Sequence, residues 1–141
     1  MQVTMIPYDH VERMWPSVEE HMEKAAKYTF GRYTAEDIKD LVLHYDHTLW
    51  AAFDEEGIVG AVVTNFTNYP RLRTLDMTFT GGTRLEEWRK PMLKLLQRWA
   101  RDNNCDVIES TGRPGWAKIF KDDGHRVRFH TYELPVGEKD G

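Results

Sequence analysis

The stretch that decides the fold runs from Arg71 to Arg101 and reads RLRTLDMTFTGGTRLEEWRKPMLKLLQRWAR. Its first part predicts a strand with one buried face, because apolar residues recur at about every second position: Leu72, Leu75, Met77 and Phe79. Its second part predicts an amphipathic helix, because apolar residues recur every three or four positions: Leu85, Trp88, Met92, Leu95, Leu96 and Trp99. Thr83 and Glu86 have the spacing of a capping box, so we expect them to mark the start of this helix.

Gly81 and Gly82 stand between the predicted strand and the predicted helix and indicate a turn. A strand, a glycine turn and a capped helix leave backbone N–H groups directed at whatever lies over the turn. Such an arrangement suits an anion, typically a phosphate. Glycine pairs are also common in turns that bind nothing. A phosphate cradle and a plain strand-to-helix turn are therefore both open interpretations of this pair.

Composition limits the class of protein. The chain has 141 residues, 40% of them hydrophobic and 12% aromatic, which favours one globular domain with a sizeable core. The formal net charge of −4 argues against nucleic-acid binding. Cys105 is the only cysteine, so an internal disulfide is excluded. The sequence has no signal-peptide pattern and no apolar run of about 20 residues. We therefore expect a soluble, cytoplasmic protein that does not enter a membrane.

The segments on either side predict the remaining elements. Pro16 is expected to break or restart a helix that begins at Val11, and Thr34 with Asp37 is expected to cap a second helix. The expected elements are a strand at 3–6, helices from 11 and from 35 to 45, strands at 49–53, 58–66 and 71–80, the long helix to about 102, a buried strand at 105–109, a helix at 116–121 and a strand at 126–134.

This order, β-α-α-β-β-β-α-β-α-β, predicts a single α/β (α+β) domain over residues 1–136. We expect a mixed, mostly antiparallel sheet, and a flexible tail over residues 137–141.

The succession of elements resembles the GNAT superfamily of N-acyltransferases over nearly the whole chain. In that family the fourth strand and the long helix hold the pyrophosphate of acetyl-coenzyme A on backbone amides, and the strands splay apart to admit the pantetheine arm. The resemblance implies that the cofactor lies over residues of the glycine segment: Thr80, Gly81, Gly82, Thr83 and Arg84. Arg113, in a basic segment, could also pair with the coenzyme's phosphates or with an acidic partner.

The sequence departs from the family pattern at two places. The family's phosphate loop usually reads Gln/Arg-x-x-Gly-x-Gly/Ala, whereas the segment from Phe79 to Arg84 is shorter. The family often has a tyrosine in the late short helix as general acid toward the thiolate, and Phe120 stands at the matching position. Phenylalanine donates no proton, so Tyr132 or Cys105 would have to take that role.

A further short motif resembles small GNAT-like proteins encoded by bacteriophages. It is the run from Gly112 to Trp116, which contains Arg113 and Gly115. This resemblance suggests a phage-encoded protein, located in the host cytoplasm or in the virion.

Acylation of an amine requires a base, because a lysine-type ammonium with a pKa of ~10.4 is protonated at neutral pH. Asp76 in the predicted fourth strand and Glu109 at the end of the next strand are the candidate bases. Glu109 is the better placed at the expected mouth of the cleft. Alternatively, these are solvated carboxylates at strand ends, or Glu109 pairs with Arg113.

Two functions fit these sequence patterns. The first is transfer of an acyl group from acetyl-coenzyme A to an amine of a small molecule or a protein, and the second is an inactive GNAT-like accessory or virion protein that binds a protein partner. Nucleic-acid binding is unlikely on charge. A metal is not expected, because His44, Asp46 and His47 lack the additional ligands that complete a zinc site.

Overall fold

The computed structural model of the chain describes residues 1–139, which divide into two compact units. The first unit is Met1–Thr111, and the second begins at Gly112. Each unit is described by itself.

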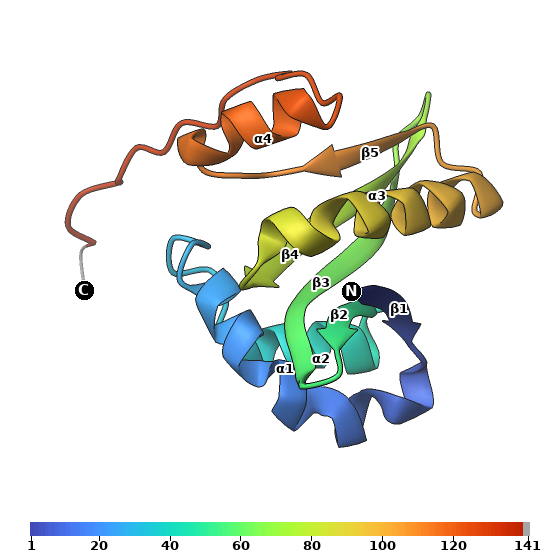
Figure 1. Cartoon of the computed structure of the whole chain (residues 1–141). Helices are drawn as coiled ribbons and strands as arrows, with labels where there is room; N and C mark the ends of the chain where they lie inside the picture. Colours follow the sequence, from blue (N-terminus) through green and yellow to red (C-terminus); the bar gives the residue numbers. More distant parts are fainter. Residues whose placement is uncertain (140–141) are drawn as a thin grey trace. The chain divides into compact units, whose positions relative to one another are not determined.

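The first unit is built on one five-stranded sheet in which the strands follow one another in chain order (Figure 1). Four neighbouring pairs make the sheet, three of them antiparallel and the last, β4 with β5, parallel. The mixed, mostly antiparallel sheet expected from the sequence is thus confirmed. The strands are β1 (Gln2–Ile6), β2 (Thr48–Asp54), β3 (Gly57–Asn68), β4 (Arg73–Gly82) and β5 (Val107–Ser110).

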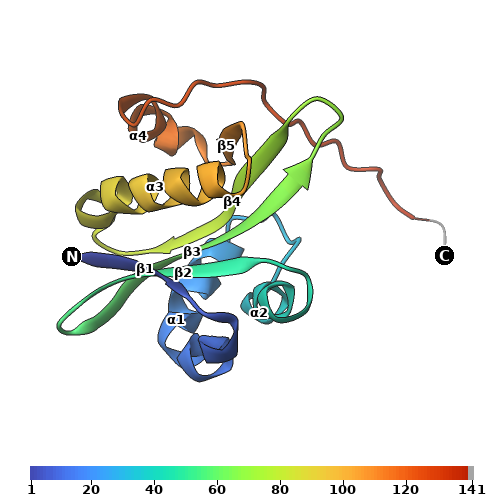
Figure 2. The same cartoon turned by 90° about the vertical axis from the view of Figure 1, so that its right-hand side faces the viewer.

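Helices cover both faces of this sheet (Figure 2). Helices α1 (Val11–Ala26) and α2 (Ala35–His44) lie on one face, and α3 (Leu85–Asp102) lies on the other. A core therefore forms on each side. The core under α1 and α2 includes Val18, Met22, Ile38, Leu49, Val63 and Phe79. The core under α3 includes Trp50, Val62, Leu75, Trp88, Met92 and Leu96.

Helix α1 runs without a break through Pro16, contrary to the sequence prediction. A proline inside a helix loses one backbone hydrogen bond and costs about 3 kcal/mol. The helix nevertheless buries Trp15, Val18 and Met22 almost completely. Full burial of each such side chain contributes about 1.5–3 kcal/mol, so packing on the sheet outweighs the proline.

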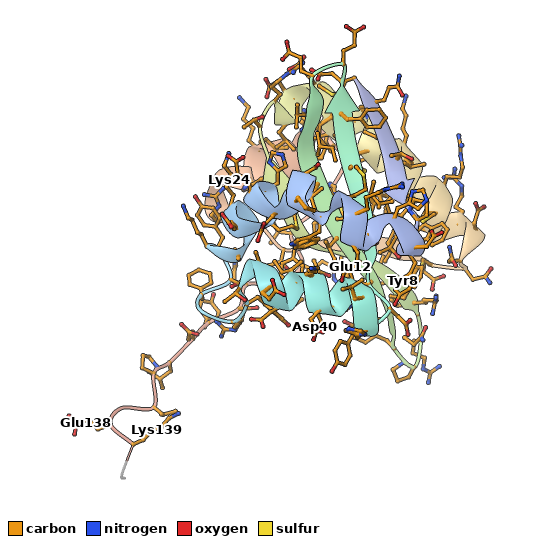
Figure 3. All side chains as sticks on the ribbon, turned by 90° about the horizontal axis from the view of Figure 1, so that it is seen from below. Tyr8, Glu12, Lys24, Asp40, Glu138 and Lys139 are labelled. Carbon is orange, nitrogen blue, oxygen red and sulfur yellow. The ribbon has the colours of Figure 1, made fainter. Side chains whose placement is uncertain are left out.

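The start of α2 confirms the predicted cap. Thr34 Oγ1 accepts a hydrogen bond from the Asp37 N–H at 3.1 Å, and Asp37 Oδ2 accepts one from the Thr34 N–H at 2.9 Å. Figure 3 shows α1 and α2 side by side, with Glu12 and Asp40 among their outer side chains. Glu12 forms a 3.3 Å ion pair with Lys39, which links the two helices.

Strand β4 contains a bulge that the alternation of its sequence does not reveal. Val63 pairs with Phe79 while Thr64 pairs with Met77, so Thr78 is an extra residue in β4. Leu75 and Met77 therefore face the core under α3, whereas Phe79 is turned into the core under α1 and α2. The prediction of one buried face from Leu72 to Phe79 was wrong for this reason.

Strand β5 lies at the edge of the sheet and not at its centre. It is four residues long, Val107–Ser110, and Val107 is 40% exposed. Only Ile108 packs on the core under α3. The prediction of a strand buried in the sheet centre, which rested on a short apolar run, was therefore wrong.

The second unit contains a 3-10 turn, Pro114–Trp116, and the short helix α4 (Ala117–Asp122). The Phe120 ring packs between the rings of Trp116 and His125. Within residues 126–134 no strand forms, so the predicted last strand was wrong. An alternating segment needs a partner strand and a core to cover it, and the apolar side chains here are exposed: Val127, Phe129, Tyr132 and Leu134.

The predicted tail over residues 137–141 falls partly outside the described residues, which end at residue 139. Along the described part of the chain, no helix is both long and apolar enough to cross a membrane.

Candidate functional site

The most distinctive feature of the first unit is the fork between β4 and β5. These strands pair in parallel from Thr74 with Val107 to Met77 with Ser110, and β5 ends there. Strand β4 continues to Gly82 (Figure 1). Among the described strands, β3 alone pairs with this last part of β4. The backbone from Thr78 to Gly82 therefore presents one edge on which an extended ligand could form hydrogen bonds.

Both carboxylates predicted as bases lie at this fork, and the structure brings them together. Asp76 and Glu109 are direct partners in the β4–β5 register, one step before the strands separate. Neighbouring strands lie ~4.8 Å apart, and partners in a register project from the same face. Leu75 and Ile108, one residue earlier, pack on the core under α3. Asp76 and Glu109 therefore project from the opposite face.

The Asp76 carboxylate is held by polar side chains of β3 and β4. Its Oδ2 accepts hydrogen bonds from Thr67 Oγ1 at 2.5 Å and from Asn65 Nδ2 at 3.4 Å. Its Oδ1 accepts one from Thr74 Oγ1 at 2.7 Å. Thr78 Oγ1, on the bulge, donates to Asn65 Oδ1. This cluster fixes the orientation of Asp76 at the fork.

Asn65, Thr67 and Thr74 were not predicted as site residues, although the sequence contains a signal for them. Asn65 and Thr67 are two residues apart in β3, and Thr74 and Asp76 are two residues apart in β4. Polar residues at every second position of two adjacent strands indicate a shared polar face.

The predicted glycine turn does not exist. Gly81 and Gly82 are the last residues of β4, paired with Ala61 and Gly60 of β3. A Cβ atom on Gly81 would lie 1.9 Å from the carbonyl oxygen of His21 in α1. Gly82 has φ +143°, and its Cβ would lie 2.5 Å from the Cα of Gly60. Close packing of the backbone therefore requires glycine at both positions.

The predicted capping box of α3 is also wrong. Thr83 lies next to the end of β4, where its N–H donates to the Val59 carbonyl oxygen at 2.9 Å. The residue at the N-cap of α3 is Arg84, in a left-handed conformation with φ 54°, and its side chain makes no capping hydrogen bond. The Trp88 indole N–H donates to the Thr83 carbonyl at 2.8 Å and fixes this corner. The extension of strand pairing to Thr83 has displaced the helix start by one residue.

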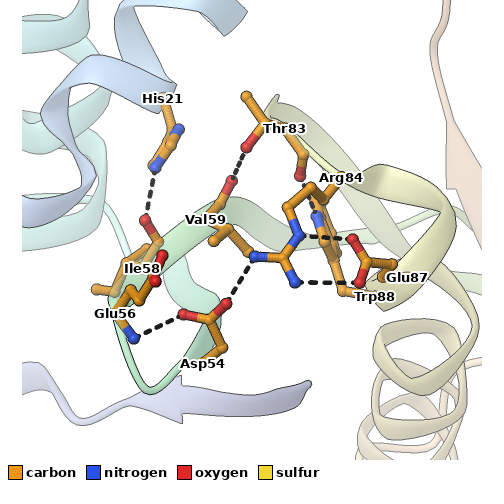
Figure 4. A network of polar contacts seen from close by, with 9 residues as sticks. All are labelled: His21, Asp54, Glu56, Ile58, Val59, Thr83, Arg84, Glu87 and Trp88. Atoms are coloured by element: carbon orange, nitrogen blue, oxygen red, sulfur yellow. Dashed lines mark hydrogen bonds and ion pairs between the residues drawn. The ribbon is translucent and has the colours of Figure 1, made fainter.

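Arg84 is held by two carboxylates (Figure 4). Its NH1 donates at 2.6 Å to Oδ2 of Asp54, the last residue of β2, at the β2–β3 hairpin. Its Nε and NH2 donate to the two oxygens of Glu87 at 2.5 and 3.0 Å. Hydrogen bonds from Arg84 lower the pKa of both Asp54 and Glu87, and the two carboxylates raise the pKa of Arg84. This guanidinium is thus already paired.

The surroundings of Arg84 are acidic. An open hollow of about 720 Å³ is lined by residues of the β2–β3 hairpin, the start of the chain and Arg84: Met1, Gln2, Phe53, Asp54, Glu55, Glu56 and Arg84. The first turn of α3 adds Glu86 and Glu87. Carboxylates around a helix N-terminus interact favourably with the helix dipole, but they repel an anion.

The remaining predicted site residues are Thr80 and Arg113. Thr80 lies in β4 beyond the bulge, half-buried and paired with Val62. Arg113 belongs to the second unit, where it is exposed and its carbonyl accepts a hydrogen bond from the Trp116 N–H at 2.9 Å. Within residues 1–139 no group of three or more His, Cys, Asp or Glu side chains is arranged to hold a metal ion.

No protein-family model and no curated protein matches the chain. Solved structures do match along its full length. A probable acetyltransferase has a TM-score of 0.71 at 13% identity, covering 99% of this chain and all of the other. A ribosomal-protein-alanine N-acetyltransferase from Brucella melitensis biovar Abortus 2308 has a TM-score of 0.68 at 12% identity, covering 96% and 100%.

A predicted acetyltransferase from Clostridium acetobutylicum, solved with acetyl-CoA, has a TM-score of 0.67 at 15% identity, covering 96% of each chain. Similarity at this level of identity concerns the fold. The chain therefore has the GNAT-like fold that the order of its elements predicted.

Proposed function

We propose that the protein is an N-acyltransferase that moves an acetyl or other acyl group from coenzyme A to an amine. The observation that carries this proposal is the fork itself, where the free edge of β4 begins beside Asp76 and Glu109. The fold it shares with acetyltransferases, one of them solved with acetyl-CoA, supports the proposal. The acceptor is an amine of a small molecule or of a protein.

The proposed reaction is direct transfer. The amine nitrogen attacks the thioester carbonyl carbon, so that a C–N bond forms and the C–S bond breaks. Before the attack, one proton of the incoming ammonium passes to the Glu109 carboxylate. As the intermediate collapses, the nitrogen loses a second proton to solvent and the departing thiolate takes a proton from solvent. Backbone N–H groups on the free edge of β4 stabilise the oxyanion of the tetrahedral intermediate.

The two carboxylates have different roles in this scheme. Asp76 already accepts hydrogen bonds from Thr67, Thr74 and Asn65. These donors hold the Asp76 carboxylate in place, and its role is to orient the ammonium by charge. Glu109 stands directly opposite and removes the proton.

The test is an assay of thiol release from acetyl-CoA with a panel of small amines and amine-bearing peptides. We expect transfer to at least one acceptor. Removal of a general base typically lowers the rate by about 10²–10⁴-fold, so Glu109→Gln should lower kcat by that amount. Asp76→Asn should mainly raise KM for the amine. Glu20→Gln, on the exposed side of α1, is the matched control and should leave both constants unchanged.

The alternative is a non-catalytic GNAT-like protein that binds a protein partner, as in a phage accessory or virion component. The pairing of Arg84 with Asp54 and Glu87 favours it, as does Phe120 at the position of the family's tyrosine. No heat on calorimetric titration with acetyl-CoA, together with no thiol release for any acceptor, would exclude the transferase and leave this alternative.

A further inference from the structure

We infer that the nucleotide phosphates of the acyl donor contribute little to its binding. This leaves the neutral acyl-pantetheine arm, which the family resemblance places between the splayed strands, as the part that the free edge of β4 recognises. This inference rests on the proposed transferase function and specifies the donor that the fork accepts.

The first argument concerns the backbone groups at the end of β4. A diphosphate bound at a strand-to-helix junction is held by N–H groups that converge on it. Here the Thr83 N–H donates to Val59, which extends the β3–β4 pairing to the edge of α3. Gly81 and Gly82 lie within the ladder itself. Strand pairing therefore extends to the residue before the N-cap of α3, and the Thr83 N–H is not available to a phosphate.

The second argument concerns the cation at that junction. Arg84 makes three short charge-assisted hydrogen bonds with Asp54 and Glu87. To bind a phosphate, Arg84 would have to give up these hydrogen bonds to carboxylates for hydrogen bonds of similar strength to phosphate oxygens. The exchange brings little gain, since the two released carboxylates stay beside the bound phosphates.

The third argument concerns the local field. Two carboxylates, Asp54 and Glu87, pair with the Arg84 guanidinium, and Glu55 and Glu56 line the hollow beside it. A diphosphate placed there is repelled within a Debye length of about 8–10 Å at ordinary salt. A neutral ligand is not.

The free edge of β4 differs in charge from the acidic surroundings of Arg84. From Thr78 to Gly82 it offers backbone donors and acceptors without a charged side chain. The pantetheine arm carries two amide groups and no charge, so it can pair with this edge as an added strand does. Its thioester end would then reach the fork, where Asp76 and Glu109 lie.

The experiment compares three donors with the same amine: acetyl-CoA, acetyl-dephospho-CoA and S-acetyl-pantetheine. We expect kcat/KM to agree within about threefold across the series and to change little between ~0.02 and ~0.5 M salt. A preference for acetyl-CoA of about 100-fold or more, the size of two charge-assisted hydrogen bonds, would overturn the inference. If no donor is consumed, the proposed transferase function itself fails.

A variant that releases Arg84 sharpens the test. The double substitution Asp54→Asn with Glu87→Gln keeps the shape of both side chains and removes their charges. Calorimetric titration should show affinity for coenzyme A rising by about tenfold while affinity for pantetheine is unchanged. Glu55→Gln is the control on the same hairpin, because the ion pairs of Arg84 are with Asp54 and Glu87. It should raise affinity for coenzyme A by less than about twofold.

If the double variant binds coenzyme A no better than the wild type, then Asp54 and Glu87 do not keep Arg84 from binding phosphates, and this part of the inference is wrong. Thermal unfolding of each variant identifies any loss of fold. A parallel titration with pantetheine confirms that the edge of β4 is intact.

Discussion

Asp76 of β4 and Glu109 of β5 are partners in the single parallel pair of strands in the sheet. A parallel register places side chains at the same level on the same face, so two carboxylates from distant parts of the chain meet where the strands separate. The side chains of Asn65, Thr67 and Thr74 hold the Asp76 carboxylate by hydrogen bonds.

We predict that Asp76→Asn destabilises the fold. The amide group replaces one acceptor oxygen by a donor, which then faces hydroxyl or amide donors of Thr67, Thr74 and Asn65. Loss of such a hydrogen bond with an unsatisfied group costs about 1–3 kcal/mol. Urea unfolding measures this cost, and an unchanged free energy of unfolding would show that Asp76 is not held as described.

We predict a similar loss when the buried contact between Trp50 and Thr64 is removed. The Trp50 indole N–H donates to Thr64 Oγ1 at 2.9 Å, and both residues are 1% exposed. Thr64→Val keeps the shape but leaves the N–H unpaired, which should cost about 1–3 kcal/mol in the free energy of unfolding. Thr64→Ser keeps the hydroxyl and should lie closer to the wild type. Equal stability of the valine variant would contradict the contact.

A third prediction concerns close packing at Gly81. Gly81→Ala would place a methyl group 1.9 Å from the backbone oxygen of His21, so β4 and α1 must separate. Overpacking of this kind costs about 3 kcal/mol or more, and the thermal midpoint should fall accordingly. Gly115→Ala is the control: its Cβ meets nothing within 4 Å, and its stability should stay within about 0.5 kcal/mol of the wild type.

The fourth prediction concerns the loss of folding stability at acid pH. Arg84 lowers the pKa of Asp54 from its ordinary 3.8, chiefly by a hydrogen bond, and lowers that of Glu87 from 4.5 in the same way. Carboxyls with lowered folded-state pKa values stabilise the fold above their unfolded pKa values, and this contribution is lost as the pH falls through the folded ones.

Arg84→Ala should therefore be less stable than the wild type at neutral pH, and the two curves should converge as the pH falls through the lowered pKa values of Asp54 and Glu87. NMR titration of the carboxyl carbons is the direct measurement. In the variant both pKa values should return toward 3.8 and 4.5. Titration curves that coincide with those of the wild type would mean that the ion pairs do not persist in solution.

Local patterns were sufficient for most of the fold. The capping box of α2 and the period of α3 depend on neighbours in the sequence, and the structure confirms both. The succession of elements was sufficient for the architecture, including the placing of Asp76 and Glu109 on adjacent strands.

What the sequence did not reveal depends on contacts between distant segments. The bulge at Thr78 is set by the register with β3, and no local pattern in β4 marks it. Gly81 and Gly82 have the appearance of a turn until Gly60 and α1 are known to lie against them. The pairing of Arg84 could not be predicted from local sequence either, because its partner Asp54 is thirty positions away along the chain.

At the corner where β3, β4 and α3 meet, neighbouring positions differ in how freely they can be substituted. A Cβ atom on Gly60 would lie 2.5 Å from the Trp88 ring, and one on Gly82 equally close to Gly60. Saturation mutagenesis should find these positions almost intolerant, while Asp54 and Glu87 beside them accept most residues. A lineage could then change its preference for charged or neutral donors by exchanging surface carboxylates, without any rearrangement of the backbone that bears them.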